Sequence, residues 1–226
     1  MLNITVYSSL IISIIIQIIT GIIEIISLFL NISKKFIFLK QMILLEVLVQ
    51  VLEGSFYIYW LFNFKNIINI TPKRYFDWII TTPTMLINLI FYLIFLKYKE
   101  ENKSQDLNFF PLLKKEFNTI SLILILNWLM LLFGYLGEVS QIPVILGVLL
   151  GFIPFVIYYY IIYIKYAILT KEGIKIFLYF LFFWSLYGIV AIFPYKTKNI
   201  CYNILDLFSK NFFGLFLIYI IYINKL

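Results

Sequence analysis

The chain has 226 residues, of which 63% are hydrophobic and only 13% are charged, and its formal net charge is +7. This composition excludes a soluble globular domain and indicates a protein embedded in a lipid bilayer. The excess of basic residues is explained by membrane topology, so we do not expect nucleic-acid binding.

Seven apolar segments are long enough to cross a bilayer core of about 30 Å, which takes roughly 20 helical residues. Their predicted bounds are 4–30, 38–62, 74–97, 117–137, 141–169, 172–194 and 200–223. The first segment lacks a charged start and a small-residue cleavage site, so we interpret it as a retained helix. The connections are short, apart from a solvated loop between Lys97 and Glu116. The sequence therefore predicts residues 1–226 to be a single all-α domain, a bundle of seven transmembrane helices.

Lysines gather in the loops on one side of the predicted membrane. The loops after the first, third and fifth segments hold Lys34, Lys35, Lys40, Lys97, Lys99, Lys103, Lys114, Lys115, Lys165, Lys171 and Lys175. The opposite side holds Lys65, Lys73, Lys196 and Lys198. The positive-inside rule predicts an external N-terminus and a cytoplasmic C-terminus that includes Lys225. The one cysteine, Cys201, excludes an intrachain disulfide, and without histidine we expect no zinc site.

The first two segments carry polar side chains at helical spacing. Glu46, Gln50 and Glu53 fall at i, i+4 and i+7 on the second segment, which needs none of them to span the membrane. The first segment has a similar row, which consists of Ser9, Ser13, Gln17, Thr20 and Glu24. Such stripes could line a water-filled path, and acidic groups in a path of this kind select cations.

Structural roles are the alternative for several of these side chains. We expect Glu24 to be solvated near the cytoplasmic interface and Glu138 to be an exposed loop residue. Glu46 could equally be a protonated hydrogen-bond partner between helices or a gate. Gln17 and Gln50 are more often contacts between helices than ligands. Glu53 lies nearer the membrane middle, which favours a constriction or a proton-release role.

The third and seventh segments carry charges that cannot face lipid. Arg74, Asp77 and Thr81 share one face at i, i+3 and i+7, and Lys210 follows Asp206 by one helical turn. A lysine in the middle of a span costs about 3 kcal/mol on insertion scales, which marks a functional site. A desolvated lysine with a carboxylate partner is suited to a Schiff base with an aldehyde cofactor. An ion-pair network that only fixes helix packing is the alternative.

Three motifs resemble the microbial (type 1) rhodopsins. Arg74-Tyr75-x-Asp77-Trp78-x-x-Thr81-Thr82-Pro83 is similar to their third helix and Trp184-Ser185-Leu186-Tyr187 to their sixth. Leu205-Asp206-x-x-Ser209-Lys210-x-x-Phe213-Gly214 is similar to their seventh. The resemblance covers all seven helices and implies a photoreceptor without enzymatic activity that binds all-trans retinal.

The resemblance also implies a role for each matched residue. Lys210 would carry retinal as a protonated Schiff base, with Asp77 as counterion and primary proton acceptor. Asp206 would be the second counterion, and Arg74 would pair with both aspartates through water. The polyene would lie between Trp78 and Trp184, and the remaining pocket residues would be Thr81, Thr82, Met130, Gly134 and Tyr187.

Other positions bear on what light would drive. Asn88 stands where outward proton pumps of the family carry a carboxylate, eleven residues after the acceptor, so fast pumping is not expected. Gly188 and Ala191 replace the proline and tryptophan of many pumps. The glutamates of the second segment, together with Asn203 near Asp206, resemble channel-type rhodopsins, in particular the compact ones encoded by large algal viruses.

This narrower resemblance favours a light-gated cation channel in a host-cell or viral membrane. Its expected ion pathway contains Ser13, Glu46, Gln50, Glu53 and Asn203. The expected partners are the lipid bilayer, monovalent cations and protons, and the resemblance leaves a homo-oligomer open. The alternative functions are a slow outward proton pump that uses Asp77, a sensory receptor that signals through a partner, and an intramembrane enzyme that uses the aspartates.

Overall fold

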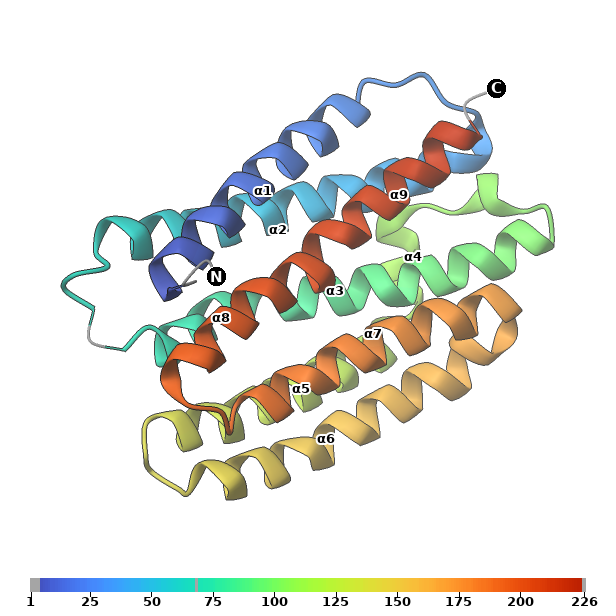
Figure 1. Ribbon diagram of the computed structural model, residues 1–226. Helices are drawn as coiled ribbons and strands as arrows, with labels where there is room; N and C mark the ends of the chain where they lie inside the picture. The colour runs from blue at the N-terminus through green and yellow to red at the C-terminus, as the bar shows by residue number, and fades with distance from the viewer. Residues whose placement is uncertain (1–4, 68, 225–226) are drawn as a thin grey trace.

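The computed structural model describes residues 5–67 and 69–224, and these residues form helices and short connections. Residue 4 of the first predicted segment and Lys225 lie outside the described residues. Seven long helical rods run side by side (Figure 1). They are α1 (Val6–Ser27), α2 (Ile37–Phe62), α3 (Thr71–Glu100), α5 (Phe117–Glu138), α6 (Val144–Lys165), α7 (Lys171–Val190), and a last rod made of α8 (Tyr195–Asp206), η4 (Leu207–Asn211) and α9 (Phe212–Ile223).

The seven-helix bundle expected from the sequence is confirmed, with differences at the connections. The loop predicted from Lys97 to Glu116 is shorter than expected, because α3 continues to Glu100 and is followed by the 3-10 turn η2 (Ser104–Asp106) and the helix α4 (Phe109–Lys115). The backbone N–H of Phe109 donates to Oε1 of Gln41 on α2, over 2.9 Å. Short 3-10 turns also precede α2 and α7, namely η1 (Lys34–Phe36) and η3 (Ala167–Leu169).

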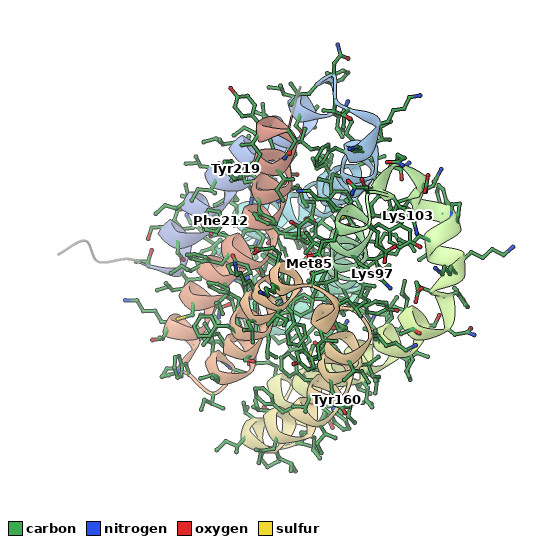
Figure 2. All side chains as sticks on the ribbon, turned by 90° about the vertical axis from the view of Figure 1, so that its right-hand side faces the viewer. Met85, Lys97, Lys103, Tyr160, Phe212 and Tyr219 are labelled. Atoms are coloured by element: carbon green, nitrogen blue, oxygen red, sulfur yellow. The ribbon has the colours of Figure 1, made fainter. Side chains whose placement is uncertain are left out.

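The distribution of side chains fits a lipid environment. Six of the described helices are long and apolar enough to cross a membrane. The remaining rod, α2, has 26 residues and turns Glu46, Gln50 and Glu53 into the interior. Exposed Tyr160 and Tyr219 project outward in Figure 2. Many isoleucines and leucines are exposed as well. With polar groups inside and apolar groups outside, the protein is an integral, multi-pass membrane protein.

The central helix α3 contains Pro83, which has no N–H to donate to the carbonyl of Ile79. That carbonyl instead accepts a hydrogen bond of 2.9 Å from Nε1 of Trp128 on α5. The proline therefore leaves no unpaired backbone oxygen at Ile79 and joins α3 to α5. Among the six apolar spans, α3 is the most buried, which places its polar face in the middle of the bundle.

The last rod changes its hydrogen bonding around Lys210. In η4 the N–H of Phe212 donates to the carbonyl of Leu207, five residues back, as in a π-helix. A carbonyl in the same turn, that of Phe208, accepts a hydrogen bond of 2.7 Å from the hydroxyl of Tyr179 on α7. Single π-helical turns within α-helices are frequent at functional sites. Here the turn contains the buried lysine.

Candidate functional site

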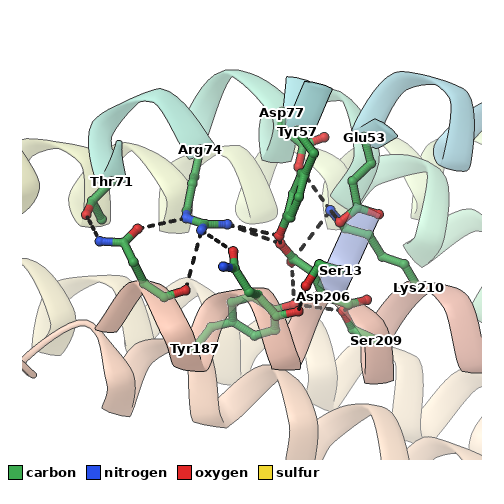
Figure 3. Close-up of polar contacts among 12 residues, drawn as sticks. Ser13, Glu53, Tyr57, Thr71, Arg74, Asp77, Tyr187, Asp206, Ser209 and Lys210 are labelled. Atoms are coloured by element: carbon green, nitrogen blue, oxygen red, sulfur yellow. Dashed lines mark hydrogen bonds and ion pairs between the residues drawn. The ribbon is translucent and has the colours of Figure 1, made fainter. Parts of the chain in front are cut away.

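A buried lysine lies among three carboxylates from three parts of the bundle (Figure 3). Nζ of Lys210 lies 3.0 Å from Oδ2 of Asp77 on α3, 3.1 Å from Oε1 of Glu53 on α2, and 3.6 Å from Oδ1 of Asp206 on α8. These side chains are at most 1% exposed. The sequence pointed to the two aspartates as partners of Lys210, whereas Glu53 was expected in the ion pathway. The structure brings all three to the same amine.

The three carboxylates could by themselves hold a metal ion. One oxygen from each of Glu53, Asp77 and Asp206 lies within 4.8 Å of the others. The ammonium group of Lys210 already stands within ion-pair distance of each of them. The lysine therefore supplies the positive charge at this site.

Arg74 lies one layer further along the bundle, towards the end where α1 begins. Its Nη1 lies 3.4 Å from Oδ2 of Asp206, and its Nε donates to Oδ1 of Asn199 over 3.1 Å. Its Nη2 donates to Oδ1 of Asn203. The expectation that Arg74 pairs with both aspartates through water is wrong for Asp206, since the guanidinium reaches that carboxylate directly.

Sequence reasoning missed Tyr57. Its hydroxyl donates to Oδ2 of Asp206 over 2.5 Å and accepts from Nη1 of Arg74 over 3.0 Å. The signal was present in the sequence, because Tyr57 continues the polar stripe of α2 four residues after Glu53. Asn199 was missed in the same way, four residues before Asn203 on the last rod. Both side chains are fully buried; Tyr57 contacts Arg74 and Asp206, and Asn199 contacts Arg74.

An apolar cavity with an empty volume of about 770 Å³ opens beside Lys210. Trp78 and Trp184 line it, and so do Thr82, Met130, Gly134, Tyr187 and Asp206. Thr81 lies off the cavity, and its hydroxyl donates to the carbonyl of Asp77 over 3.0 Å. Tyr75 and Ser209, which belong to the motifs but were given no role, also line the cavity. Lining residues outside the motifs include Met85, Asn127, Leu131, Gly147, Val148, Gly151, Phe152, Phe155, Tyr158 and Tyr202.

Two glycines allow close approach at the cavity wall. A Cβ atom on Gly188 would lie 2.7 Å from Cε2 of Phe152, and one on Gly134 would lie 2.7 Å from the hydroxyl oxygen of Tyr75. The rings of Phe152 and Tyr75 therefore occupy the space that a side chain at position 188 or 134 would fill. A mostly apolar cavity with an amine at its wall suits an apolar aldehyde such as retinal.

The residues expected in the ion pathway lie between α1, α2, α3 and the last rod. Nδ2 of Asn203 donates to Oγ of Ser9 over 2.8 Å, and Oγ of Ser13 donates to the carbonyl of Asn203 over 3.2 Å. On the other side of Lys210, Nδ2 of Asn211 donates to Oε1 of Gln50 over 3.1 Å. Further on, Nδ2 of Asn88 donates to Oε1 of Glu46 over 2.6 Å. These polar side chains are at most 6% exposed.

Two acidic residues were misplaced by sequence reasoning. Glu24, expected in solvent, is 0% exposed and packs against Gly214. Glu138, expected in an exposed loop, ends α5 and pairs with Lys198 on α8, with side-chain exposures of 6% and 9%. Both expectations are wrong because a residue near the end of a predicted span can still be covered by another helix.

Seven membrane-embedded helices, a buried lysine in a cluster of carboxylates and an adjoining apolar cavity define a light-receptor bundle of the microbial rhodopsin type. The family model described as bacteriorhodopsin-like protein matches residues 5–224, and the chain belongs to this family. Its members are light-driven ion transporters or photoreceptors that normally bind retinal through a lysine Schiff base.

Solved structures with the same fold include a viral rhodopsin. The viral rhodopsin OLPVRII is 27% identical, with a TM-score of 0.80 over 95% of this chain and 96% of that one. A blue light-absorbing proteorhodopsin from Med12 is 20% identical, with a TM-score of 0.74 over 97% and 98% of the two chains. Halorhodopsin, a light-driven chloride pump, is 13% identical, with a TM-score of 0.73 over 100% and 98%. A search of curated proteins finds no match.

Proposed function

We propose that this protein is a light-gated cation channel that holds all-trans retinal on Nζ of Lys210. The observation that carries the proposal is the position of Lys210, where the apolar cavity meets the row of buried polar side chains on α1, α2, α3 and the last rod. When bound, retinal supplies light-driven isomerisation beside the charge cluster. Trp78 and Trp184 confine the ligand, while Met130, Gly134, Thr82 and Tyr187 shape the rest of its pocket.

The charge cluster can neutralise itself by holding one proton. Lys210 and Arg74 supply two positive charges against the three carboxylates. Asp206 accepts hydrogen bonds from Tyr57 and Tyr187, and Asp77 accepts one from Lys210. Apart from its ion pair with Lys210, Glu53 has no hydrogen-bond partner among the described residues. Of the three carboxyls, Glu53 is the one that accepts no hydrogen bond of normal geometry from the described residues, and such a buried group keeps a proton most readily, so we assign the proton to Glu53.

Proton transfer from Nζ of Lys210 to Oδ2 of Asp77, 3.0 Å away, would change what holds the helices together. It removes the charge pair between Asp77 on α3 and Lys210 on the last rod, and Oε1 of Glu53 on α2 no longer faces a charged amine. Loosened contacts at Glu53 and Asn203 would let water join the two halves of the polar row. Carboxylate and amide oxygens along that row favour cations. With the N-terminus outside, Ser9 and Asn203 lie in the external half and Glu46 in the cytoplasmic half.

A slow outward proton pump is the second candidate, and the Glu46–Asn88 pair is the observation that favours it. Asn88 occupies the position of the pump carboxylate, yet the carboxyl of Glu46 lies 2.6 Å from its amide. A proton held on Glu46 could therefore return to the Lys210 site from the adjacent helix. In this case Asp77 would still receive the outgoing proton.

Voltage-clamp recording under illumination separates the two functions. A channel gives a photocurrent whose reversal potential follows the cation gradient when external sodium or pH is changed. A pump gives a current at zero driving force that keeps its direction across the voltage range. Outward current that does not reverse would overturn the channel proposal and support the pump.

In the same recordings, Glu53→Gln should keep a visible absorption band and alter conduction. The amide matches a protonated carboxyl in shape but cannot ionise, so cation current should fall about tenfold, the effect of roughly 1.4 kcal/mol on a barrier. Glu100→Gln, the same change at an exposed position, is the matched control. Unchanged conductance and selectivity in Glu53→Gln would rule out the pore role of Glu53.

A further inference from the structure

Glu24 is a buried acid that the retinal site does not use. It lies near the C-terminal end of α1, its side chain is 0% exposed, and neither carboxyl oxygen has a hydrogen-bond partner among the described residues. An isolated carboxylate in such surroundings is costly, so the group is held there in its neutral, protonated form. A membrane helix does not need an acid at this position, which calls for a function.

The carboxyl group of Glu24 occupies the space above Gly214. A Cβ atom built on Gly214 would lie 1.9 Å from Oε1 of Glu24 and 2.9 Å from its Cδ, so any other residue at position 214 would displace the acid. Gly214 follows Lys210 by one helical turn, just beyond the π-helical turn η4. The contact therefore joins α1 directly to the backbone of the segment that carries the lysine.

The contact between Glu24 and Gly214 belongs to the row of buried polar groups that runs from Lys210 towards the end of the bundle where α9 ends. Gly21, one turn before Glu24 on α1, faces Gln50, since a Cβ atom on Gly21 would lie 3.9 Å from Cβ of Gln50. Gln50 in turn is hydrogen-bonded to Asn211. Glu24 is thus the next polar group after the layer formed by Gln50 and Asn211.

Several other buried polar atoms in this half of the bundle lack hydrogen-bond partners in the described part of the chain. Atoms without a hydrogen-bond partner among the described residues include both amide atoms of Gln17, Oε2 of Glu46, Nε2 of Gln50, Oδ1 of Asn88 and Oδ1 of Asn211. These atoms gain hydrogen bonds when water enters. Water therefore opposes the closed packing here more than it would oppose a packing of apolar side chains. This half of the row is therefore suited to opening.

We propose that Glu24 is the gate of this half of the ion pathway, with Gly214 as its seat. Seated on Gly214, the neutral side chain closes the row between Lys210 and the C-terminal end of the bundle. Displaced from Gly214 when α9 shifts relative to α1, it meets water, ionises and places a cation-selecting carboxylate in the path. This inference rests on the proposed channel function and adds a residue that determines closing and selectivity.

Gly214→Ala tests the gate directly, because its methyl group takes the place of the carboxyl. In voltage-clamp recordings, the current should decay at least about tenfold more slowly after the light is switched off, as expected when a closed state loses roughly 1.4 kcal/mol. Glu24→Ala, which removes the gate without crowding the helix, should slow closing in the same way. Gly21→Ala adds a methyl group with only ordinary contacts and should close at the wild-type rate.

The infrared carboxyl band of Glu24 gives a second readout that needs neither current nor retinal. We expect a C=O stretching band of a protonated, dry carboxyl that is lost in Glu24→Gln and displaced in Gly214→Ala, also in the retinal-free protein. If wild-type currents reverse with the cation gradient but both gate variants close at the wild-type rate, the gate is overturned and the channel stands. If no wild-type current reverses, the proposed channel function fails. Independently of any current, an unchanged infrared band in Gly214→Ala would show that the carboxyl of Glu24 does not pack on Gly214.

Discussion

Lys210→Ala is expected to abolish visible absorption completely when the protein is supplied with all-trans retinal. Lys210 is the only lysine that lines the cavity in the described part of the chain, and its amine lies beside Asp77 and Glu53. No other amine there can hold the ligand next to carboxylates that stabilise a positive charge. Absorption spectra of the purified protein should show the band of free retinal alone.

Two further variants distinguish loss of the attachment point from loss of the fold. Lys210→Arg keeps a cation among the three carboxylates but provides no amine for the aldehyde, so it should fold and remain colourless. Lys198→Ala removes another buried lysine from the same rod, one that pairs with Glu138 away from the cavity, and should remain coloured. A red-shifted band in Lys210→Arg would refute the assignment of Lys210.

Arg74→Gln is expected to lower the free energy of unfolding by about 3–5 kcal/mol, because it removes one partner of a buried ion pair and leaves Asp206 with Lys210 as its remaining cation. Asp206 would lose an ion pair of 3.4 Å, while Asn199 and Tyr57 would lose hydrogen bonds of 3.1 Å and 3.0 Å. The guanidinium also lies 5.1 Å from the ring centroid of Trp60, so a cation–π contact is lost as well. Reversible unfolding in mixed micelles measures the difference.

Controls for Arg74→Gln are provided by its neighbour and by a charge-preserving change. Lys73→Gln alters a half-buried charge at the next position and should change stability by no more than about 0.5 kcal/mol. Arg74→Lys keeps the charge but cannot bond Asp206, Asn199 and Tyr57 together, so it should be intermediate. Equal stability of Arg74→Gln and the wild type would show that the ion pair with Asp206 contributes nothing to the fold.

Much of the fold could be predicted because the bilayer imposes strong rules on sequence. Apolar segments of spanning length gave the seven rods, and the cost of intramembrane charge directed attention to Asp77, Asp206 and Lys210. Helical spacing alone placed Arg74 and Asp77 on one face. These features depend on residues within one helix or on a motif, so they can be read along the chain.

The rest depends on how helices meet, which spacing along one helix does not show. Glu53 belongs to the Lys210 cluster because α2 packs against α3 at that depth, and Glu24 is buried because Gly214 on another helix leaves room for it. Glu138 is covered because Lys198 stands opposite. Tyr57 could have been found by extending the α2 stripe by one more turn. For Glu53, Glu24 and Glu138 the missing information was the partner helix.

Reductive trapping with borohydride, followed by peptide mass spectrometry, tests most directly whether retinal is held on Lys210. Wild-type protein loaded with all-trans retinal should carry the reduced adduct on the peptide that contains Lys210, and on no other lysine. An adduct on a different lysine, or a coloured protein without an adduct on Lys210, would contradict this account of the site.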